Sequence, residues 1–205
     1  MLYKEADEYM YREKLHQQQS MKSGIVTILL RMLEARDFVT EGHCERLQDL
    51  VAQLATRIGL NERDINDMIL FAQFHDIGKV GISDSILFKP GKLSKEEYEE
   101  MKRHSEIGYR IAISIPDLVP IADWIYKHHE WWNGTGYPLG LKGREIPVQC
   151  RILSIADAFD AMTSDRPYRK ALPMEFALKE LKKCSGTQFD PEFVEYFIEM
   201  IENNP

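Results

Sequence analysis

Five of the six histidines lie beside or among acidic residues, in a pattern that suits metal binding. The imidazole and carboxylate side chains of this pattern are, in chain order, His43, His75, Asp76, His104, His128, His129 and Asp157. Such side chains bind first-row transition metals, and seven of them are enough to hold two ions. Two metals together can lower the pKa of a water molecule and neutralise charge on phosphoryl oxygens. The pattern therefore predicts a binuclear site suited to hydrolysis of a phosphate ester.

Asp76 is the residue that we expect between the two metals. Its two carboxylate oxygens can each face one ion, and the adjacent His75 can reach one of them. His43 and Asp157 would complete one metal site, and the other would be completed by His104, His128 and His129. A single histidine is usually a structural or surface residue, as we expect of His16, but seven such residues in this order favour a site.

The identity of the metals follows in part from the ligand types. None of the seven is a thiolate, so a structural zinc site is not expected, and nitrogen and oxygen donors of this kind suit iron or manganese. Zinc remains an alternative on ligand types alone. Lys79, three residues after Asp76, supplies a cation that can bind a phosphate or protonate a leaving oxygen.

Helices are the elements that must position these residues. Apolar residues recur at three- and four-residue spacing along most of the chain, and no stretch alternates as a strand would. The predicted helices cover about 21–36, 44–58, 61–75, 94 onward, 118–129, 148–163, 173–184 and 191–202. The fold class is therefore all-α, with inward-pointing ligands on several helices of a bundle.

Capping residues place the ends of these helices. Asn61 is a predicted N-cap, Ser94 to Glu97 is a capping box, and Asp190 precedes a proline at the first helical position. His75 and Asp76 then fall at a helix C-terminus that Gly78 ends, and His104 falls near the middle of the helix from Ser94. Residues 79–93 and the Gly- and Pro-rich residues 131–147 are predicted loops.

Composition limits the class of protein. At 205 residues with 44% hydrophobic and 29% charged residues, the chain is long enough for a domain with a large core. A net charge of −7 argues against a surface that coats a nucleic acid polymer. No apolar run is long enough to span a membrane, and no signal peptide is recognisable. Three cysteines without CxxC spacing fit a reduced, cytoplasmic location.

Three motifs in this chain resemble the HD-GYP family. They are His75-Asp-Ile-Gly-Lys79, the double histidine followed by Gly136-Tyr-Pro138, and the segment from Asp157 to Arg169. The resemblance covers roughly residues 30–200. It implies an all-α HD-domain bundle with a long GYP loop, two iron or manganese ions, and hydrolysis of cyclic di-GMP to pGpG in bacterial signalling. Further cleavage to GMP is left open.

The resemblance also implies roles for individual residues. The seven residues singled out above match the metal ligands of the family, and Asp76 and Lys79 match its catalytic positions. Lys79, Tyr137, Arg166 and Arg169 match the substrate-binding positions. Glu130 and Asp160 are expected to orient metal ligands through hydrogen bonds.

Two positions differ from the family pattern. Some members hold a third metal with a glutamate four residues before the first histidine, where this chain has Val39. Glu41 is two residues away and would point elsewhere on a helix. We therefore expect two metals. Asn133 stands where the family usually has aspartate, which removes one charge from the GYP loop.

The N-terminal segment resembles another signalling domain. Residues 6–14 are similar to the last helix of a GGDEF (diguanylate cyclase) domain over about a dozen positions. This implies that residues 1–34 form a linker helix and residues 35–205 the HD-GYP catalytic domain. The helix is then a plausible homodimer contact, and a GGDEF domain is a plausible partner in cis or in trans.

Other functions fit the same residues. An enzyme with this site could instead cleave cyclic GMP-AMP or a nucleotide such as (p)ppGpp, although the long loop and the arginine pair favour a cyclic dinucleotide. In a different class, the chain could be a catalytically silent module that senses a dinucleotide or docks a partner. A silent module would tolerate losses among the seven metal residues, and all seven are present.

Overall fold

The computed structural model describes Gly24, Ile28, Arg31, residues 42–165 and residues 170–203. Within these residues there is no β-strand, only two isolated bridges. The elements are α2 (His43–Ile58), α3 (Glu62–Phe74), η1 (Ile77–Gly81), α4 (Asp84–Leu87), α5 (Lys95–Lys102), α6 (His104–Ile113), α7 (Val119–Lys127), η2 (Gly143–Glu145), α8 (Val148–Thr163), α9 (Met174–Lys183) and α10 (Pro191–Glu202). The predicted all-α class is confirmed. Val39, Arg166, Arg169 and nearly all of the predicted 1–34 linker lie outside the described residues.

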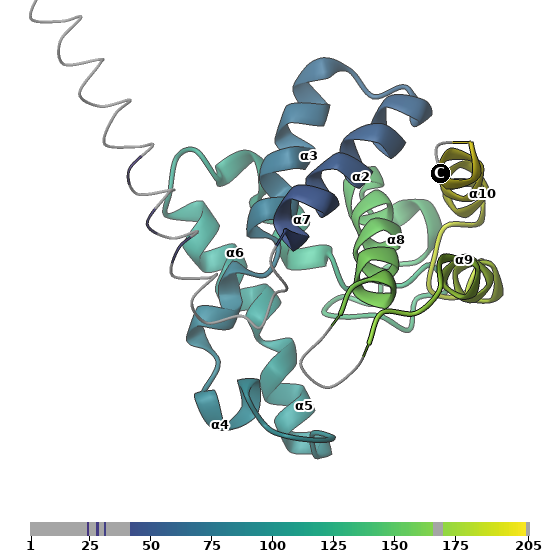
Figure 1. Cartoon of the computed structure of the whole chain (residues 1–205). Coiled ribbons are helices and arrows are strands. Elements are labelled where there is room, and N and C mark those ends of the chain that lie inside the picture. The colour runs from purple at the N-terminus through teal and green to yellow at the C-terminus, as the bar shows by residue number, and fades with distance from the viewer. Residues whose placement is uncertain (1–23, 25–27, 29–30, 32–41, 166–169, 204–205) are drawn as a thin grey trace, which may run out of the picture.

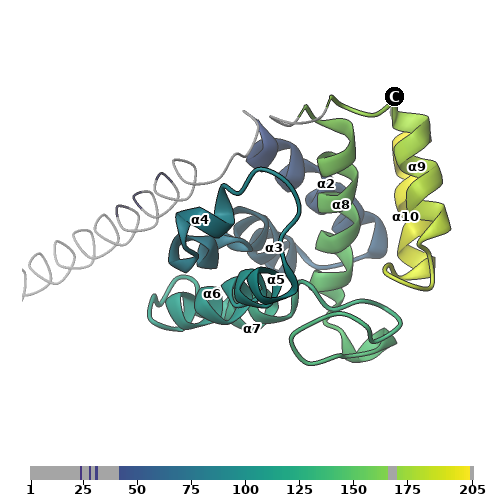
Figure 2. The ribbon, with the colours of Figure 1, turned by 90° about the horizontal axis from the view of Figure 1, so that it is seen from below.

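Two helix pairs form the centre of the domain, as Figure 1 shows. Helix α2 packs on α3, α6 packs on α7, and contacts between α3 and α7 join the two pairs. Helix α8 covers α2, and α9 and α10 pack on α8. In Figure 2 α9 and α10 lie on one side of α8, and α4 to α7 lie on the other. No helix in the described ranges is both long and apolar enough to cross a bilayer.

Apolar side chains from these helices form one core. The largest fully buried ones include Leu47, Leu54, Met68, Phe71, Phe74, Ile121, Ile125 and Phe197. Phe71 meets Trp124 edge to face with ring centroids 5.7 Å apart, which ties α3 to α7. Burying each such side chain contributes about 1.5–3 kcal/mol. The core therefore fixes the relative positions of the helices whose ends carry the candidate ligands.

The predicted helix caps are confirmed. The Asn61 side chain accepts a hydrogen bond from the amide of Asp64, and Ser94 and Glu97 form a reciprocal capping box. Asp190 caps α10 in front of Pro191. These local signals depend only on neighbouring residues, which explains why the sequence alone was sufficient to find them.

The prediction that His104 lies in mid-helix is wrong. The helix from Ser94 ends at Lys102, and a new helix begins at His104 itself. The imidazole of His104 donates to the carbonyl of Met101, and the Ser105 hydroxyl donates to the carbonyl of Lys102. Side-chain donors of this kind compete with the helical hydrogen bonds, so the helix breaks between α5 and α6.

The predicted loop 79–93 is partly ordered as η1 and α4, and Gly78 does not end α3 as expected. Helix α3 ends at Phe74, and Gly78 lies inside η1, packed against α6. A Cβ atom on Gly78 would lie 1.8 Å from the His104 carbonyl oxygen and 2.5 Å from the Gly108 amide nitrogen. Gly78 is therefore required for space, so that η1 and α6 can touch through their backbones.

We expect Gly78→Ala to destabilise the fold strongly, because the added methyl group can be accommodated only if η1 and α6 separate. Overpacking of this kind costs about 1–3 kcal/mol or more, and each kcal/mol lowers the melting temperature by about 2–4 °C in a domain of this size. Thermal unfolding measures the effect.

Gly59→Ala is the matched control. Gly59 has φ 89° but no neighbouring atom within 4 Å of an added Cβ, so this variant reports only the cost of the left-handed backbone. That cost is about 1–2 kcal/mol. An equal loss of stability in the two variants would contradict the close-packing argument for Gly78.

Candidate metal centre

Three candidate ligands lie at the C-terminal ends of helices. His75 caps α3, His128 caps α7, and His104 follows the residue that caps α5. In each, the Nδ1 atom lies 2.7–2.8 Å from the carbonyl oxygen three residues earlier, on Ala72, Ile125 and Met101 respectively. Because a carbonyl oxygen can only accept, each Nδ1 carries the proton and donates it. When such a ring is neutral, its Nε2 atom therefore carries a lone pair that can bind a metal.

The lone pairs of these rings converge on Asp76. The Nε2 atom of His104 lies 3.3 Å from that of His128 and 3.1 Å from that of His129. Ligand atoms of these three histidines and Asp76 all lie within 4.8 Å of one another. The Nε2 atoms of His104 and His128 have no proton to share, so lone pairs face each other in a buried site. A cation between them removes that repulsion, and the donor set fits a divalent metal.

The protonation states of the rings also suit a metal. Burial lowers the pKa of His104, and burial with repulsion from His129 lowers the pKa of His128 well below its ordinary value. Burial and the proximity of His104 lower the pKa of His129 to about 3. These three rings are therefore neutral near pH 7, the form in which imidazole binds a metal. For His75, burial is outweighed by the charge of Asp76, and the pKa rises to about 9.

Asp76 lies between two groups of side chains, of which His75, His104 and His128 are candidate ligands. Its Oδ2 atom is 3.2 Å from the Nε2 atom of His75 and 2.7 Å from the Nζ atom of Lys79. Its Oδ1 atom is 3.5 Å from the Nε2 atom of His104 and 3.9 Å from that of His128. Burial raises the pKa of this carboxyl group, but the charges of Lys79 and His75 outweigh burial and lower the pKa well below its ordinary value. Asp76 is therefore an anion with one oxygen toward each group.

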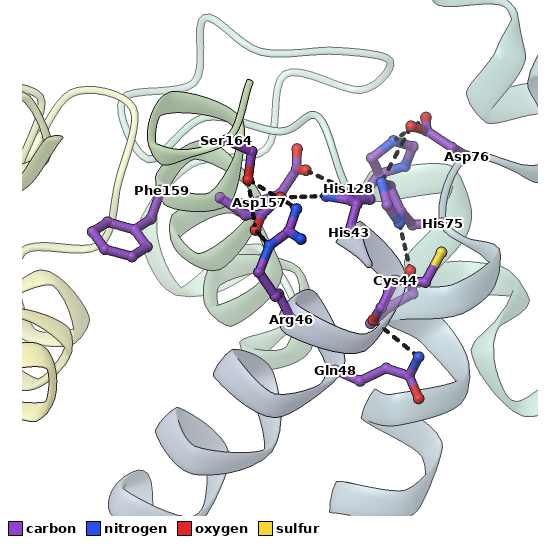
Figure 3. Close-up of polar contacts among 12 residues, drawn as sticks. His43, Cys44, Arg46, Gln48, His75, Asp76, His128, Asp157, Phe159 and Ser164 are labelled. Carbon is purple, nitrogen blue, oxygen red and sulfur yellow. Dashed lines mark hydrogen bonds and ion pairs between the residues drawn. The ribbon is translucent and has the colours of Figure 1, made fainter. Parts of the chain in front are cut away.

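His43 belongs to a second cluster, shown in Figure 3. Its Nδ1 atom lies 2.5 Å from the Oδ2 atom of Asp160, and its Nε2 atom lies 3.9 Å from the Oδ1 atom of Asp157. Arg46 donates from Nε to the other oxygen of Asp160 at 2.5 Å. Burial opposes ionisation of Asp160, but His43 and Arg46 outweigh it and lower the pKa to about 2. The Asp160 carboxylate thus orients the His43 ring with its Nε2 atom toward Asp157.

The hydrogen bonds of Glu130 differ from the expected ones, which were to orient a metal ligand. Both hydrogen bonds described for its carboxylate go to the long loop and not to a metal ligand. Its oxygens accept from the amides of Leu139 at 2.6 Å and Leu141 at 2.9 Å, and the side chain is buried. Glu130 therefore holds the loop of residues 131–147 against the end of α7.

Tyr137 lies directly on the metal cluster. Its ring stacks on that of His129 with centroids 4.7 Å apart, and its amide donates to the His129 carbonyl. Gly136 makes this approach possible, because a Cβ there would lie 2.3 Å from the Trp131 amide nitrogen. Burial raises the pKa of the Tyr137 phenol above its ordinary value, so the ring remains neutral.

A pocket of about 480 Å³ opens over these groups. Its lining includes the predicted residues His43, Asp76, Lys79, His104, His129, Tyr137 and Asp157. His75 and His128 lie beneath them, in contact with Asp76. The sequence analysis missed Lys102, Tyr98, Trp131 and Gln188, which also line the pocket, and Arg46, which orients Asp160. The one signal for Arg46 was its spacing of three residues from His43, which puts both side chains on one helix face.

Comparison with known proteins agrees with this architecture. The HD domain family matches residues 27–193, which is most of the chain. The chain belongs to the HD-domain family.

Curated relatives of this HD domain include several phosphodiesterases. It is 44% identical over 178 residues to a cyclic di-GMP phosphodiesterase of Thermotoga maritima, covering 86% of this chain and 48% of the relative. It is 40% identical to the cyclic di-GMP phosphodiesterase response regulator RpfG of Xanthomonas campestris, covering 82% of this chain and 45% of the relative. A 3'3'-cGAMP-specific phosphodiesterase of Vibrio cholerae is 36% identical, covering 82% of this chain and 36% of the relative. The chain thus spans about half the length, or less, of these relatives.

Solved structures share the fold. A cyclic GMP-AMP specific phosphodiesterase of V. cholerae superposes with a TM-score of 0.68 at 25% identity, over 87% of this chain and 47% of that one. The HD domain of the phosphodiesterase PgpH of L. monocytogenes superposes with a TM-score of 0.58 at 17% identity, over 84% of this chain and 92% of that one. At that identity the second match supports the fold alone.

We expect Asp160→Asn to weaken metal binding by this HD domain about 10- to 100-fold, because an amide holds the His43 ring less firmly and contributes no charge. Competition with a chelator of known affinity, followed by elemental analysis, measures the change.

Asp190→Asn is the matched control. Asp190 is also buried and pairs with an arginine, Arg151, at 2.6 Å, but it caps α10 and does not line the pocket. This variant should lose stability and keep its metal affinity. Unchanged metal affinity in Asp160→Asn would show that Asp160 does not support the centre.

Proposed function

We propose that this chain is an HD-GYP catalytic domain that hydrolyses cyclic di-GMP to pGpG, with a second cleavage to GMP as a slower step. The observation that carries the proposal is the position of Asp76. Its Oδ2 atom lies beside the imidazole of His75, and its Oδ1 atom faces the imidazoles of His104 and His128, at the base of a pocket. A carboxylate with a candidate ligand beside each of its oxygens supports a pair of metals at one phosphate.

The proposed metal ligands divide into two sets around Asp76. His43, His75 and Asp157 would hold one ion, and His104, His128 and His129 the other, with Asp76 contacting both. A bound pair of iron or manganese ions would activate water and neutralise charge on the phosphoryl oxygens. The protein's own contribution is to hold the ligand side chains in place before the metals arrive, so that little reorganisation remains.

Cationic side chains would hold the scissile phosphate. Lys79 reaches Asp76 at the floor of the pocket, where its ammonium group can bind a phosphoryl oxygen or protonate the leaving oxygen. Tyr137 lies across the pocket against His129. Arg166 and Arg169, outside the described residues, are assigned to the same substrate on the strength of the sequence motif.

The substrate assignment is supported by the named activities of the relatives. Those matching over most of this chain act on cyclic di-GMP or on 3'3'-cGAMP. Both substrates are cyclic dinucleotides with two phosphodiester bonds, and cyclic GMP-AMP is therefore the alternative substrate. A nucleotide such as (p)ppGpp has no such support.

The proposal extends to the organisation of the whole protein. Residues 35–205 would form the catalytic domain and residues 1–34 a linker helix from a preceding GGDEF domain, with dimerisation through that helix. A cytoplasmic location follows from the proposed second-messenger substrate.

Protein loaded anaerobically with iron or manganese should convert cyclic di-GMP to pGpG, and to GMP at longer times. Chromatography resolves the substrate and both products. Cleavage of cyclic GMP-AMP but not of cyclic di-GMP would change the substrate assignment. Tight binding of either dinucleotide without any product, at full metal occupancy, would show a silent sensing module instead.

Asp76→Ala should abolish this turnover, because it removes the carboxylate between the two ligand sets. The control is Asp123→Ala, which removes an aspartate that is paired with Lys127 on the surface of α7. Near-normal turnover by folded, metal-loaded Asp76→Ala would remove Asp76 from its proposed role.

The centre should hold two metals per chain, since Val39 replaces the glutamate that supplies a third site in some members of the HD-GYP family. Elemental analysis of protein purified without chelators gives the ratio. Three ions per chain at full occupancy would contradict the binuclear proposal.

A further inference from the structure

Lys102 forms part of the pocket wall beyond the metal centre. It lies in the last turn of α5, and its Nζ atom is 4.9 Å from the ring centroid of Tyr98 and 5.5 Å from that of Tyr137. An ammonium group over aromatic faces is held by cation–π attraction, worth about 0.5–1 kcal/mol at exposed sites. Two rings on different elements, α5 and the long loop, therefore fix the position of this charge.

The position of Lys102 relative to the metal centre is defined by Tyr137. The ring of Tyr137 stacks on His129, and the ammonium group of Lys102 lies over the same tyrosine ring. Lys102 and the candidate ligand His129 thus contact the same aromatic ring. Among the described residues that line the pocket, Lys79 and Lys102 are the two with a permanent positive charge.

Lys102 already has an ionic partner, but a weak one. Its Nζ atom lies 2.7 Å from Glu99, whose side chain is 68% exposed. Exposed pairs of this kind contribute about 0–1 kcal/mol. The ammonium group can therefore exchange this carboxylate for a more strongly held anion without a large cost.

A cyclic dinucleotide needs a cation at such a place. Its ring contains two phosphodiester groups separated by a ribose on each side, and each carries one negative charge. When one phosphate lies at Asp76, the other lies a sugar's width away, in a pocket that also contains the carboxylate of Asp157. Without a nearby cation, the second phosphate would be repelled.

We propose that Lys102, held between Tyr98 and Tyr137, binds the phosphate that is not being cleaved. This inference rests on the proposed function, since only a cyclic dinucleotide presents a second phosphate in the ring. It makes Lys102 a specificity residue: it distinguishes cyclic dinucleotides from substrates with a single phosphodiester, and it takes no part in bond cleavage.

The test compares two substrates. Cyclic di-GMP has two phosphodiesters, and bis(p-nitrophenyl) phosphate has one, so only the first can use Lys102. For metal-loaded Lys102→Gln we expect the KM for cyclic di-GMP to rise about tenfold or more, the loss of one charge-assisted contact, with little change in kcat. The kcat/KM for bis(p-nitrophenyl) phosphate should stay at the wild-type value.

Lys183→Gln is the matched control. Like Lys102, Lys183 forms an ion pair with a glutamate three residues earlier, at 2.8 Å compared with 2.7 Å for Lys102. Lys183 lies on an exposed face of α9, however, and does not line the pocket. The Lys183→Gln variant should leave the kinetic constants for both substrates unchanged. That result distinguishes the loss of any one surface charge from the loss of the contact made by Lys102.

The other outcomes overturn the inference in different ways. An unchanged KM for cyclic di-GMP in Lys102→Gln would show that Lys102 does not bind the substrate, while the proposed function stands. Equal losses with both substrates would show a structural role. A wild-type enzyme that cleaves bis(p-nitrophenyl) phosphate but neither cyclic dinucleotide would remove the proposed function and this inference together.

Discussion

The hydrogen bond from each histidine Nδ1 atom to a helix-terminal carbonyl is the interaction on which the centre depends. A helix leaves its last carbonyls without partners, and these ends carry partial negative charge. His75, His104 and His128 use those carbonyls, which satisfies the backbone and fixes the tautomer in one contact. The same contact directs each Nε2 atom inward. Three helix ends, each with partial negative charge, therefore meet at one point, and a cation there is favoured before any carboxylate is considered.

His43 is oriented by a side chain and not by a helix-terminal carbonyl. It is the first residue of α2. Its Nδ1 atom donates to Asp160 instead, and that buried carboxylate requires its own partner, Arg46. The three side chains of His43, Asp160 and Arg46 thus do for one imidazole what a single backbone carbonyl does for each of His75, His104 and His128. The packing of α8 on α2 is therefore part of the site.

The helices, their caps and the candidate ligands could be predicted from the sequence. Helix periodicity, capping motifs and the short ligand motifs each involve residues that are close together in the chain. The capping box at Ser94 and the N-cap at Asn61 are local in this sense. What could not be predicted arises from contacts between distant segments. The break before His104 depends on side chains that take helical carbonyls, and the need for glycine at position 78 appears only when η1 meets α6. The role of Glu130 likewise depends on the folded loop, whose Leu139 amide donates to its carboxylate.

The loop held by Glu130 links substrate binding to the metal centre. Two amides of the loop are fixed by the Glu130 carboxylate, and the lack of a side chain at Gly136 lets the loop lie on the backbone that follows α7. Tyr137 is thereby held where its ring contacts both His129 and Lys102. Most candidate metal ligands come from helix ends, with Asp157 in the middle of α8, whereas the wall of the pocket comes from the loop and α5. Exposed aromatic rings at that wall, Tyr98 and Trp131, are surfaces on which bases can stack. Under the proposed function, the choice among cyclic dinucleotides can therefore change through the wall while the candidate metal ligands stay the same.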